Sequence, residues 1–164
     1  MVKVKVSCGV IIRVEDGEGQ VLLLRRAPDD HWPLHYDLPR GKCDKPLGEK
    51  LIHCLKREVK EECGLDVIPV RYIDRFTYIA DDGNRESTQY NFLCRMVDPN
   101  QQIKLSKEHC EAVWVSSVGE AELLLNAEMK KTVSKVLNPD DQIVNYPENE
   151  MGEDTIKEYL ERIQ

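Results

Sequence analysis

The sequence predicts an α/β protein, in which helices cover both faces of a mixed β-sheet as an α/β/α sandwich. Segments rich in β-branched residues bracket one strongly amphipathic helical segment, and a second helical segment follows the last of them. Of the 164 residues, 41% are hydrophobic and 32% are charged, which is typical of one globular domain with a real core. There is no run of about 18 apolar residues, so no membrane-spanning helix is expected.

The first predicted elements are two strands joined by a tight turn. Residues 4–14 are rich in Val and Ile, and residues 21–24 form a second apolar run. Between them, residues 16–19 read Asp-Gly-Glu-Gly, which is typical of a turn, so a hairpin is expected. Residues 27–46 then contain four prolines, which predict a long irregular loop because proline blocks a regular helix.

The most strongly patterned element is a helix over residues 49–62. Leu51, Leu55 and Val59 recur at every fourth position and predict one buried face. Gly64 stands where a glycine commonly ends a helix in the left-handed conformation.

The remaining elements are three strands and a second helix. Strands are predicted over residues 67–77, 88–97 and 112–115, with a turn at 81–84 between the first two. A Ser-Val-Gly-Glu capping box then predicts the start of a helix over residues 117–137.

The net charge of −7 is concentrated near the end of the chain. Residues 138–164 hold eight acidic and two basic residues, a net charge of −6, which leaves −1 for residues 1–137. We therefore expect a domain over 1–137 and an acidic C-terminal extension over 138–164, with a short helix at 153–163. A nearly neutral body excludes a general nucleic-acid binder, so a polyanionic ligand requires a metal or a local basic cluster.

The cysteines and the first residues predict a cytoplasmic chain. The six cysteines form no CxxC pair and are too sparse for a disulfide framework, so reduced thiols are expected. The first six residues alternate charged and β-branched types, unlike the apolar stretch of a signal peptide. Cys43 has no histidine placed as the partner of a nucleophile.

Three glutamates of the predicted helix share one face. Glu58, Glu61 and Glu62 lie at positions i, i+3 and i+4, where like charges repel by roughly a few tenths of a kcal/mol per pair. A divalent cation removes this penalty, because Mg²⁺ takes carboxylate, water and phosphate oxygens. Arg57 can reach Glu61 one turn on, or fold over the cluster and keep a carboxylate ionised. The alternative interpretation is a solvated acidic face on a surface helix.

This region resembles the signature of the Nudix hydrolases, G-x5-E-x7-R-E-U-x-E-E-x-G-U with U aliphatic. From Glu49 to Leu65 the match is complete, and Gly41 matches the first glycine. Seven residues separate Gly41 from Glu49 instead of five, so two residues are inserted in the loop at 42–48, ahead of the helix. The resemblance extends over about residues 4–137, whereas 138–164 has no counterpart.

The resemblance implies a Nudix-type sandwich, a Nudix hydrolase domain, and Mg²⁺ (or Mn²⁺) as cofactor. The reaction it implies is hydrolysis of a nucleoside diphosphate linked to another moiety. By motif position, Glu58 and Glu62 are metal ligands and Glu61 is a ligand or the proton acceptor. Glu108, in the late segment Ser-Lys-Glu-His, is a further ligand, and the carbonyl of Arg40 completes the shell. The general base stays open, because clustered carboxyls titrate as a group.

Candidate substrate contacts are basic or aromatic. Lys42 and Arg40 flank the loop glycine and Arg26 ends a strand, so each could hold a phosphate, although charged strand ends are often only solvated. His109 either orients Glu108 or is a surface histidine. Four aromatic side chains could stack on a base, although most aromatics are core residues: Trp32, Tyr36, Phe76 and Tyr90.

Three functions follow from these patterns. The sequences Leu-Pro-Arg-Gly-Lys and Glu-His…Trp-Val most resemble family members that cleave dinucleoside polyphosphates such as diadenosine tetraphosphate. The lead-in through Lys42 and Asp44-Lys45 also resembles messenger-RNA decapping enzymes, so an RNA 5′ end is the alternative substrate. A catalytically inactive nucleotide-binding regulatory module is the alternative of a different class; the retained glutamates and Arg57 argue against it. The patterns predict nothing about oligomeric state.

Overall fold

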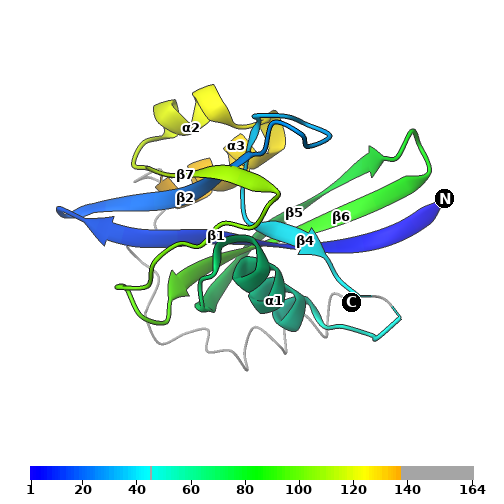
Figure 1. Cartoon of the computed structure of the whole chain (residues 1–164), viewed down its shortest axis with the longest axis horizontal. Coiled ribbons are helices and arrows are strands. Elements are labelled where there is room, and N and C mark those ends of the chain that lie inside the picture. Colours follow the sequence, from blue (N-terminus) through cyan, green and yellow to red (C-terminus); the bar gives the residue numbers. More distant parts are fainter. Residues whose placement is uncertain (45, 138–164) are drawn as a thin grey trace.

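The computed structural model describes residues 1–44 and 46–137, which form a sheet covered by helices on both faces (Figure 1). Helix α1 (Leu51–Cys63) lies on one face, and α2 (Val118–Leu124) and α3 (Ala127–Leu137) lie on the other. The predicted α/β/α sandwich is therefore confirmed. None of these helices has the length and apolar content that a membrane span requires. The helix predicted at 153–163 lies outside the described residues, as does the whole extension at 138–164.

The sheet of the described residues is mixed. Its main path runs β3-β2-β1-β6-β5, with β4 paired to β1 and β7 paired to β2. Strands β1 and β6 are parallel, whereas the other pairs are antiparallel. The strand bounds are β1 (Val2–Glu15), β2 (Glu18–Arg26), β3 (Tyr36–Asp37), β4 (Arg40–Lys42), β5 (Val67–Ala80), β6 (Arg85–Met96) and β7 (His109–Val115).

Strand β1 organises the two halves of the core, because alternate side chains of a strand point to opposite faces. Ile11 packs on the α1 side with Leu55, and Val10 packs on the α3 side with Val133. One edge of β1 is shared by two strands, β4 and β2. Its N-terminal half pairs with β4 and its C-terminal half with β2, which brings β4 against α1.

Helix α1 has the predicted buried face and the predicted end. Leu51, Leu55 and Val59 are buried. Gly64 ends the helix at φ 74°, in the left-handed region, and its N–H donates to the carbonyl of Lys60 at 3.0 Å. The helix begins at Leu51, so Glu49 lies just before it.

The loop predicted at 27–46 is less irregular than its prolines suggest. It contains β3 and β4, which pair with Leu24–Arg25 and with Val6–Cys8. Such short strands have no pattern of their own, because their pairing depends on partners distant in the sequence. Pro39 separates the two strands, where no ladder N–H is required.

The helix predicted over 117–137 is two helices. Leu125 is extended, and Asn126 begins a new N-terminus whose side chain accepts a hydrogen bond from the N–H of Met129 at 2.9 Å. The predicted cap at Ser117 is confirmed, since its hydroxyl accepts from the N–H of Glu120. The sequence pattern does not reveal this second cap, because Asn126 lies within an otherwise helical stretch.

We expect Gly64→Ala to lower the free energy of unfolding by about 1–2 kcal/mol, because a side chain at positive φ is strained. Its Cβ would also lie 3.0 Å from the Cβ of Lys104. Gly19→Ala is the matched control, because no atom lies within 4 Å of its added Cβ. Urea denaturation of both variants tests this, and equal losses would contradict a special role for the Gly64 cap.

Candidate active site

The site is built where β4 meets the glutamates of α1. The backbone N–H of Arg40 donates to Oε2 of Glu62 at 3.0 Å. At the next residue, a Cβ on Gly41 would overlap the carboxyl of Glu58. The glycine of the motif is therefore needed for space rather than for an unusual backbone angle.

Arg57 connects the same glutamates to the loop before the helix. Its guanidinium donates to Glu49 at 2.9 Å, to Glu58 at 2.9 Å and to Glu61 at 3.1 Å. It also donates to the carbonyl of Lys42 at 3.1 Å. The expected contact one turn along the helix is thus present, and these bonds raise the pKa of Arg57, with the bond to Glu49 contributing most.

The segment before β7 carries Glu108 to the same place. The N–H of Ser106 donates to the backbone carbonyl of Glu62 at 3.0 Å, and the carbonyl of Glu108 accepts from Ala27 at 2.9 Å. These bonds tie the segment to the end of α1 and to the end of β2. As a result, the four predicted carboxyl ligands share a hollow of about 240 Å³: Glu58, Glu61, Glu62 and Glu108.

The carboxyls of this hollow are held together against their own repulsion. Burial raises the pKa of Glu62 well above its usual value, despite the hydrogen bond from Arg40. The nearby carboxyls of Asp37, Glu58 and Glu108 add to this shift. Burial likewise raises the pKa of Glu58. Such an all-oxygen set, crowded and partly dry, fits a hard divalent cation.

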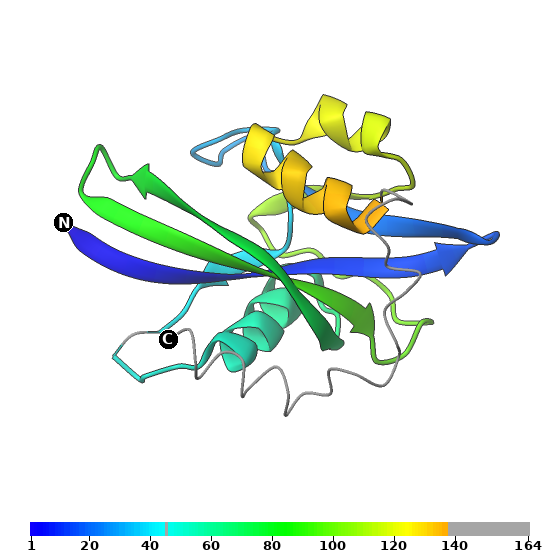
Figure 2. The same cartoon turned by 180° about the vertical axis from the view of Figure 1, so that it is seen from behind.

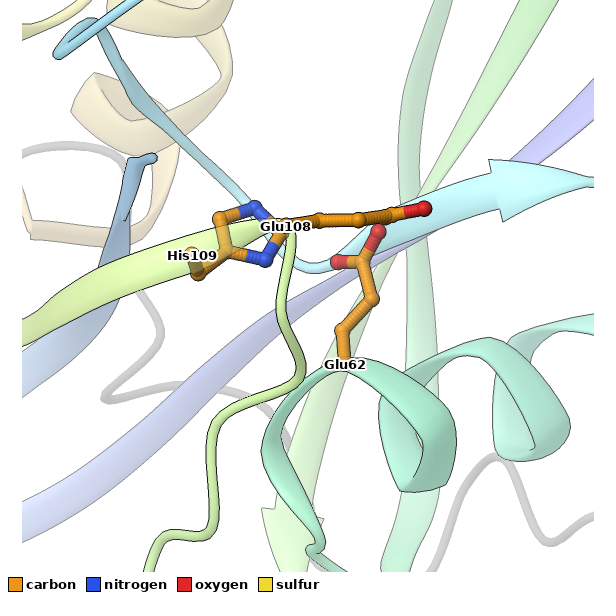
Figure 3. Close-up of side chains that lie close together, drawn as sticks. All are labelled: Glu62, Glu108 and His109. Carbon is orange, nitrogen blue, oxygen red and sulfur yellow. The ribbon is translucent and has the colours of Figure 1, made fainter. Parts of the chain in front are cut away.

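His109 is part of this cluster. It is 8% exposed, so the alternative of a surface histidine is wrong. A nitrogen of its ring and carboxylate oxygens of Glu62 and Glu108 all lie within 4.8 Å of one another (Figure 3). Burial lowers the pKa of His109.

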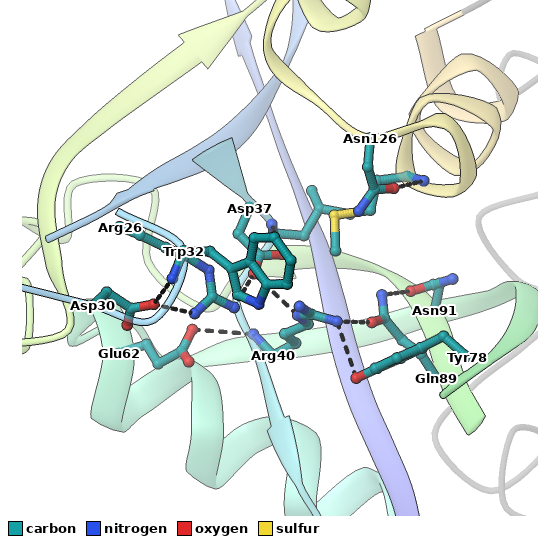
Figure 4. A network of polar contacts seen from close by, with 12 residues as sticks. Arg26, Asp30, Trp32, Asp37, Arg40, Glu62, Tyr78, Gln89, Asn91 and Asn126 are labelled. Carbon is teal, nitrogen blue, oxygen red and sulfur yellow. Dashed lines mark hydrogen bonds and ion pairs between the residues drawn. The ribbon is translucent and has the colours of Figure 1, made fainter. Parts of the chain in front are cut away.

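A buried carboxyl that the sequence analysis did not single out holds two of the predicted phosphate contacts. Asp37 accepts from Arg26 at 2.7 Å and from the side chain of Arg40 at 3.1 Å (Figure 4). Arg26 is further paired with Asp30 at 2.9 Å. Both guanidiniums therefore already bind carboxylates, which a substrate phosphate would have to displace or supplement.

The network continues across the sheet to α3, and Figure 4 shows it as far as Asn91. The guanidinium of Arg40 donates to Gln89 at 2.6 Å, and Gln89 donates to Asn91 at 2.8 Å. Asn91 in turn donates to Asp74, which also accepts from the hydroxyl of Thr132. Because these residues are spread over β4, β5, β6 and α3, sequence spacing gives no signal for the network.

A larger cleft of about 1600 Å³ opens from the carboxylates. Lys42 is exposed at its wall, and Trp32 is 59% exposed there. Tyr36 and Phe76 also line the cleft, whereas Tyr90 is buried in the core beside α1 and cannot stack on a ligand. Of the four aromatic candidates, three therefore face the cleft.

Comparison with known proteins identifies the class. The family model of the NUDIX domain matches residues 4–136. The asymmetrical bis(5′-nucleosyl)-tetraphosphatase of Mus musculus is 27% identical over 140 residues, covering 79% of this chain and 90% of that protein. An Ap4A hydrolase of C. elegans, solved as a binary complex, is 25% identical with a TM-score of 0.67, covering 81% of this chain and 94% of that one.

A MutT protein from Methanosarcina mazei Go1 is also similar, at 25% identity and a TM-score of 0.66, covering 86% of this chain and 97% of that one. The chain belongs to the NUDIX domain family and is a Nudix pyrophosphohydrolase. Nudix enzymes generally use divalent metals, which agrees with the carboxylate chemistry of the hollow.

We expect Gly41→Ala to weaken divalent-cation binding while leaving the fold intact. The added Cβ would displace the flexible carboxyl of Glu58, whereas the backbone of residue 41 already has an allowed conformation. Calorimetric titration with Mg²⁺ and thermal melting measure the two effects, with Gly19→Ala as the control. Unchanged Mg²⁺ affinity in Gly41→Ala would contradict the placement of Glu58 at the cation.

Glu62→Gln tests two effects of the Glu62 charge separately: its unfavourable effect on folding and its contribution to cation binding. Without divalent cations, we expect the variant to melt at or above the wild-type temperature, because ionisation of a carboxyl with a raised pKa disfavours folding at neutral pH. Saturating Mg²⁺ should raise the melting temperature of the wild type and of the exposed control Glu15→Gln, but not that of Glu62→Gln. A full Mg²⁺ response in Glu62→Gln would rule out Glu62 as a ligand.

Proposed function

We propose that the protein is a Mg²⁺-dependent hydrolase of dinucleoside polyphosphates such as diadenosine tetraphosphate. The observation that carries the proposal is the continuity of the carboxylate hollow with a wide cleft lined by aromatic side chains, among them the exposed Trp32. Its volume of about 1600 Å³ exceeds the roughly 300–1,000 Å³ of usual small-molecule pockets, which suits a long substrate with two nucleosides. The named activities of the mouse and C. elegans relatives support the same substrate class.

Glu58, Glu62 and Glu108, together with the carbonyl of Arg40, are the groups proposed to hold Mg²⁺. When bound, the cation neutralises phosphate charge and activates water. Glu61 is the most exposed of the motif glutamates and is paired with Arg57, so it is placed either as a ligand or to accept the proton of the attacking water.

The remaining residues of the cleft bind and orient the substrate. Lys42 is exposed in the cleft and next to the loop glycine, which supports a role for its ammonium in binding a phosphate beside the carboxylates. Trp32 offers a base an exposed indole face, and such stacking is worth about 1–3 kcal/mol per base. Arg26 and Arg40 line the same cleft and are held by Asp37, so they would bind a phosphate by displacing or supplementing these ion pairs.

The inserted loop supports an active enzyme rather than an inactive regulatory module. Arg57 binds the carbonyl of Lys42 at the start of the loop and the carboxylate of Glu49 at its end. Both ends are therefore anchored to α1, and the N–H of Arg40 still meets Glu62. The two extra residues leave the carboxylates in contact with β4.

The test is a hydrolysis screen with Mg²⁺ over diadenosine polyphosphates, nucleoside triphosphates, ADP-sugars, and triphosphorylated or capped RNA, with the products identified. We expect diadenosine tetraphosphate to give the highest kcat/KM. Glu62→Gln should reduce turnover by orders of magnitude, because a group acting in the transition state is lost, and Glu15→Gln should not.

Two outcomes would overturn the proposal. A clear preference for an RNA 5′ end would assign the RNA pyrophosphohydrolase or decapping activity instead. Nucleotide binding without turnover of any compound would favour the regulatory module.

A further inference from the structure

His109 has a buried ring nitrogen whose role the proposed function does not explain. Its Nδ1 is buried and makes no hydrogen bond within the part of the chain that the structure describes. A buried polar atom without a partner has lost its bonds to water without replacement, so such an atom at a site calls for a ligand. The residue as a whole is more than nine-tenths buried, which prevents solvent from filling this role freely.

The imidazole faces two carboxylates instead of a hydrogen-bond partner. One ring nitrogen and carboxylate oxygens of Glu62 and Glu108 lie within 4.8 Å of one another (Figure 3). Glu62 comes from α1, whereas Glu108 and His109 are consecutive at the start of β7. Ligand atoms that share a cation at about 2.1 Å lie about 3 Å apart when adjacent and about 4.2 Å apart when opposite. The observed spacing thus needs only small side-chain adjustments to enclose one ion.

We infer that His109 is a ligand, with Glu62 and Glu108, of a divalent transition-metal ion on the β7 side of the carboxylates, where all three residues line the larger cleft. This inference rests on the proposed function, because it concerns the metal site of that same enzyme. Imidazole nitrogen favours transition metals, whereas Mg²⁺ prefers oxygen ligands alone. The carboxylates therefore offer an all-oxygen set in the hollow near Glu58 and a mixed nitrogen–oxygen set at His109, which lines the larger cleft, and Glu62 belongs to both.

The surroundings of His109 agree better with a cation than with other roles. Its Nδ1 does not orient Glu108 through a hydrogen bond, because this atom has no partner in the described part of the chain. Arg26, its partner residue in the β2–β7 ladder, directs its guanidinium to Asp30 and Asp37. An anion in contact with His109 would meet the carboxylates of Glu62 and Glu108, which repel it.

Pulsed electron paramagnetic resonance of bound Mn²⁺ tests the assignment directly. The full chain is prepared with ¹⁵N-labelled histidine, loaded with Mn²⁺ without substrate, and compared with unlabelled protein. We expect a nitrogen coupling that changes from ¹⁴N to ¹⁵N on labelling, is lost in His109→Gln, and is retained in His53→Gln. His53 is the matched control because it is exposed on α1.

Calorimetric titrations supply a second readout. His109→Gln should weaken Mn²⁺ binding by about tenfold or more and alter Mg²⁺ binding by less than about threefold, because only the transition metal gains from the imidazole. Circular dichroism checks the fold of the variant; should it not fold, the isotope response of the labelled wild type still decides whether a histidine binds the ion.

The inference is overturned by Mn²⁺ bound without any histidine coupling, or by a coupling that survives in His109→Gln. Because no substrate is present, these outcomes are independent of the hydrolysis screen. A histidine-coupled Mn²⁺ in a protein that fails to cleave diadenosine tetraphosphate would uphold the metal site and refute only the proposed substrate.

Discussion

The contact between β4 and α1 is the constraint on which the site depends. Gly41 leaves no Cβ in front of Glu58, and the N–H of Arg40 holds Glu62, so two motif glutamates are placed by one three-residue strand. That strand is itself positioned by antiparallel pairing with the N-terminal half of β1. The short strand β4 thus links the central strand β1 to the carboxylates of α1.

Charge is distributed so that the carboxylates stay uncompensated on the side facing the cleft. Asp37 binds the guanidiniums of both Arg26 and Arg40, so these two cations are already paired. Arg57 balances the opposite side of the cluster, where it pairs with Glu49. A bound cation is therefore favoured at the side that faces the cleft. Without it, repulsion among the carboxylates lowers the stability of the fold.

The parts that sequence predicts well are those with a local cause. The amphipathic pattern predicts α1, the glycine after it predicts its end, and the i, i+3 and i+4 spacing predicts the shared face of three glutamates. The parts that it misses are set by distant partners. The strand β4, the buried carboxyl of Asp37 and the burial of His109 all depend on neighbours far along the chain.

One local signal in the sequence favours the wrong element. Asn126 is a good N-cap residue, but its place inside a helical pattern favoured one long helix over two. Tyr90 shows the opposite error, since an aromatic type alone does not tell a stacking surface from a core side chain. Both cases concern a residue whose meaning is decided by the packing around it.

The hydrogen bonds of Arg57 to both ends of the loop at 42–49 have a consequence for how this sequence can evolve. The guanidinium joins Lys42 to Glu49 through α1, so the intervening stretch closes on a fixed base. Loop closure grows only slowly more costly with length, at about 0.6 kcal/mol per doubling. Insertions between these two anchors are therefore nearly neutral, which makes this loop a natural position for diversification, and for grafted recognition elements, beside an unaltered catalytic centre.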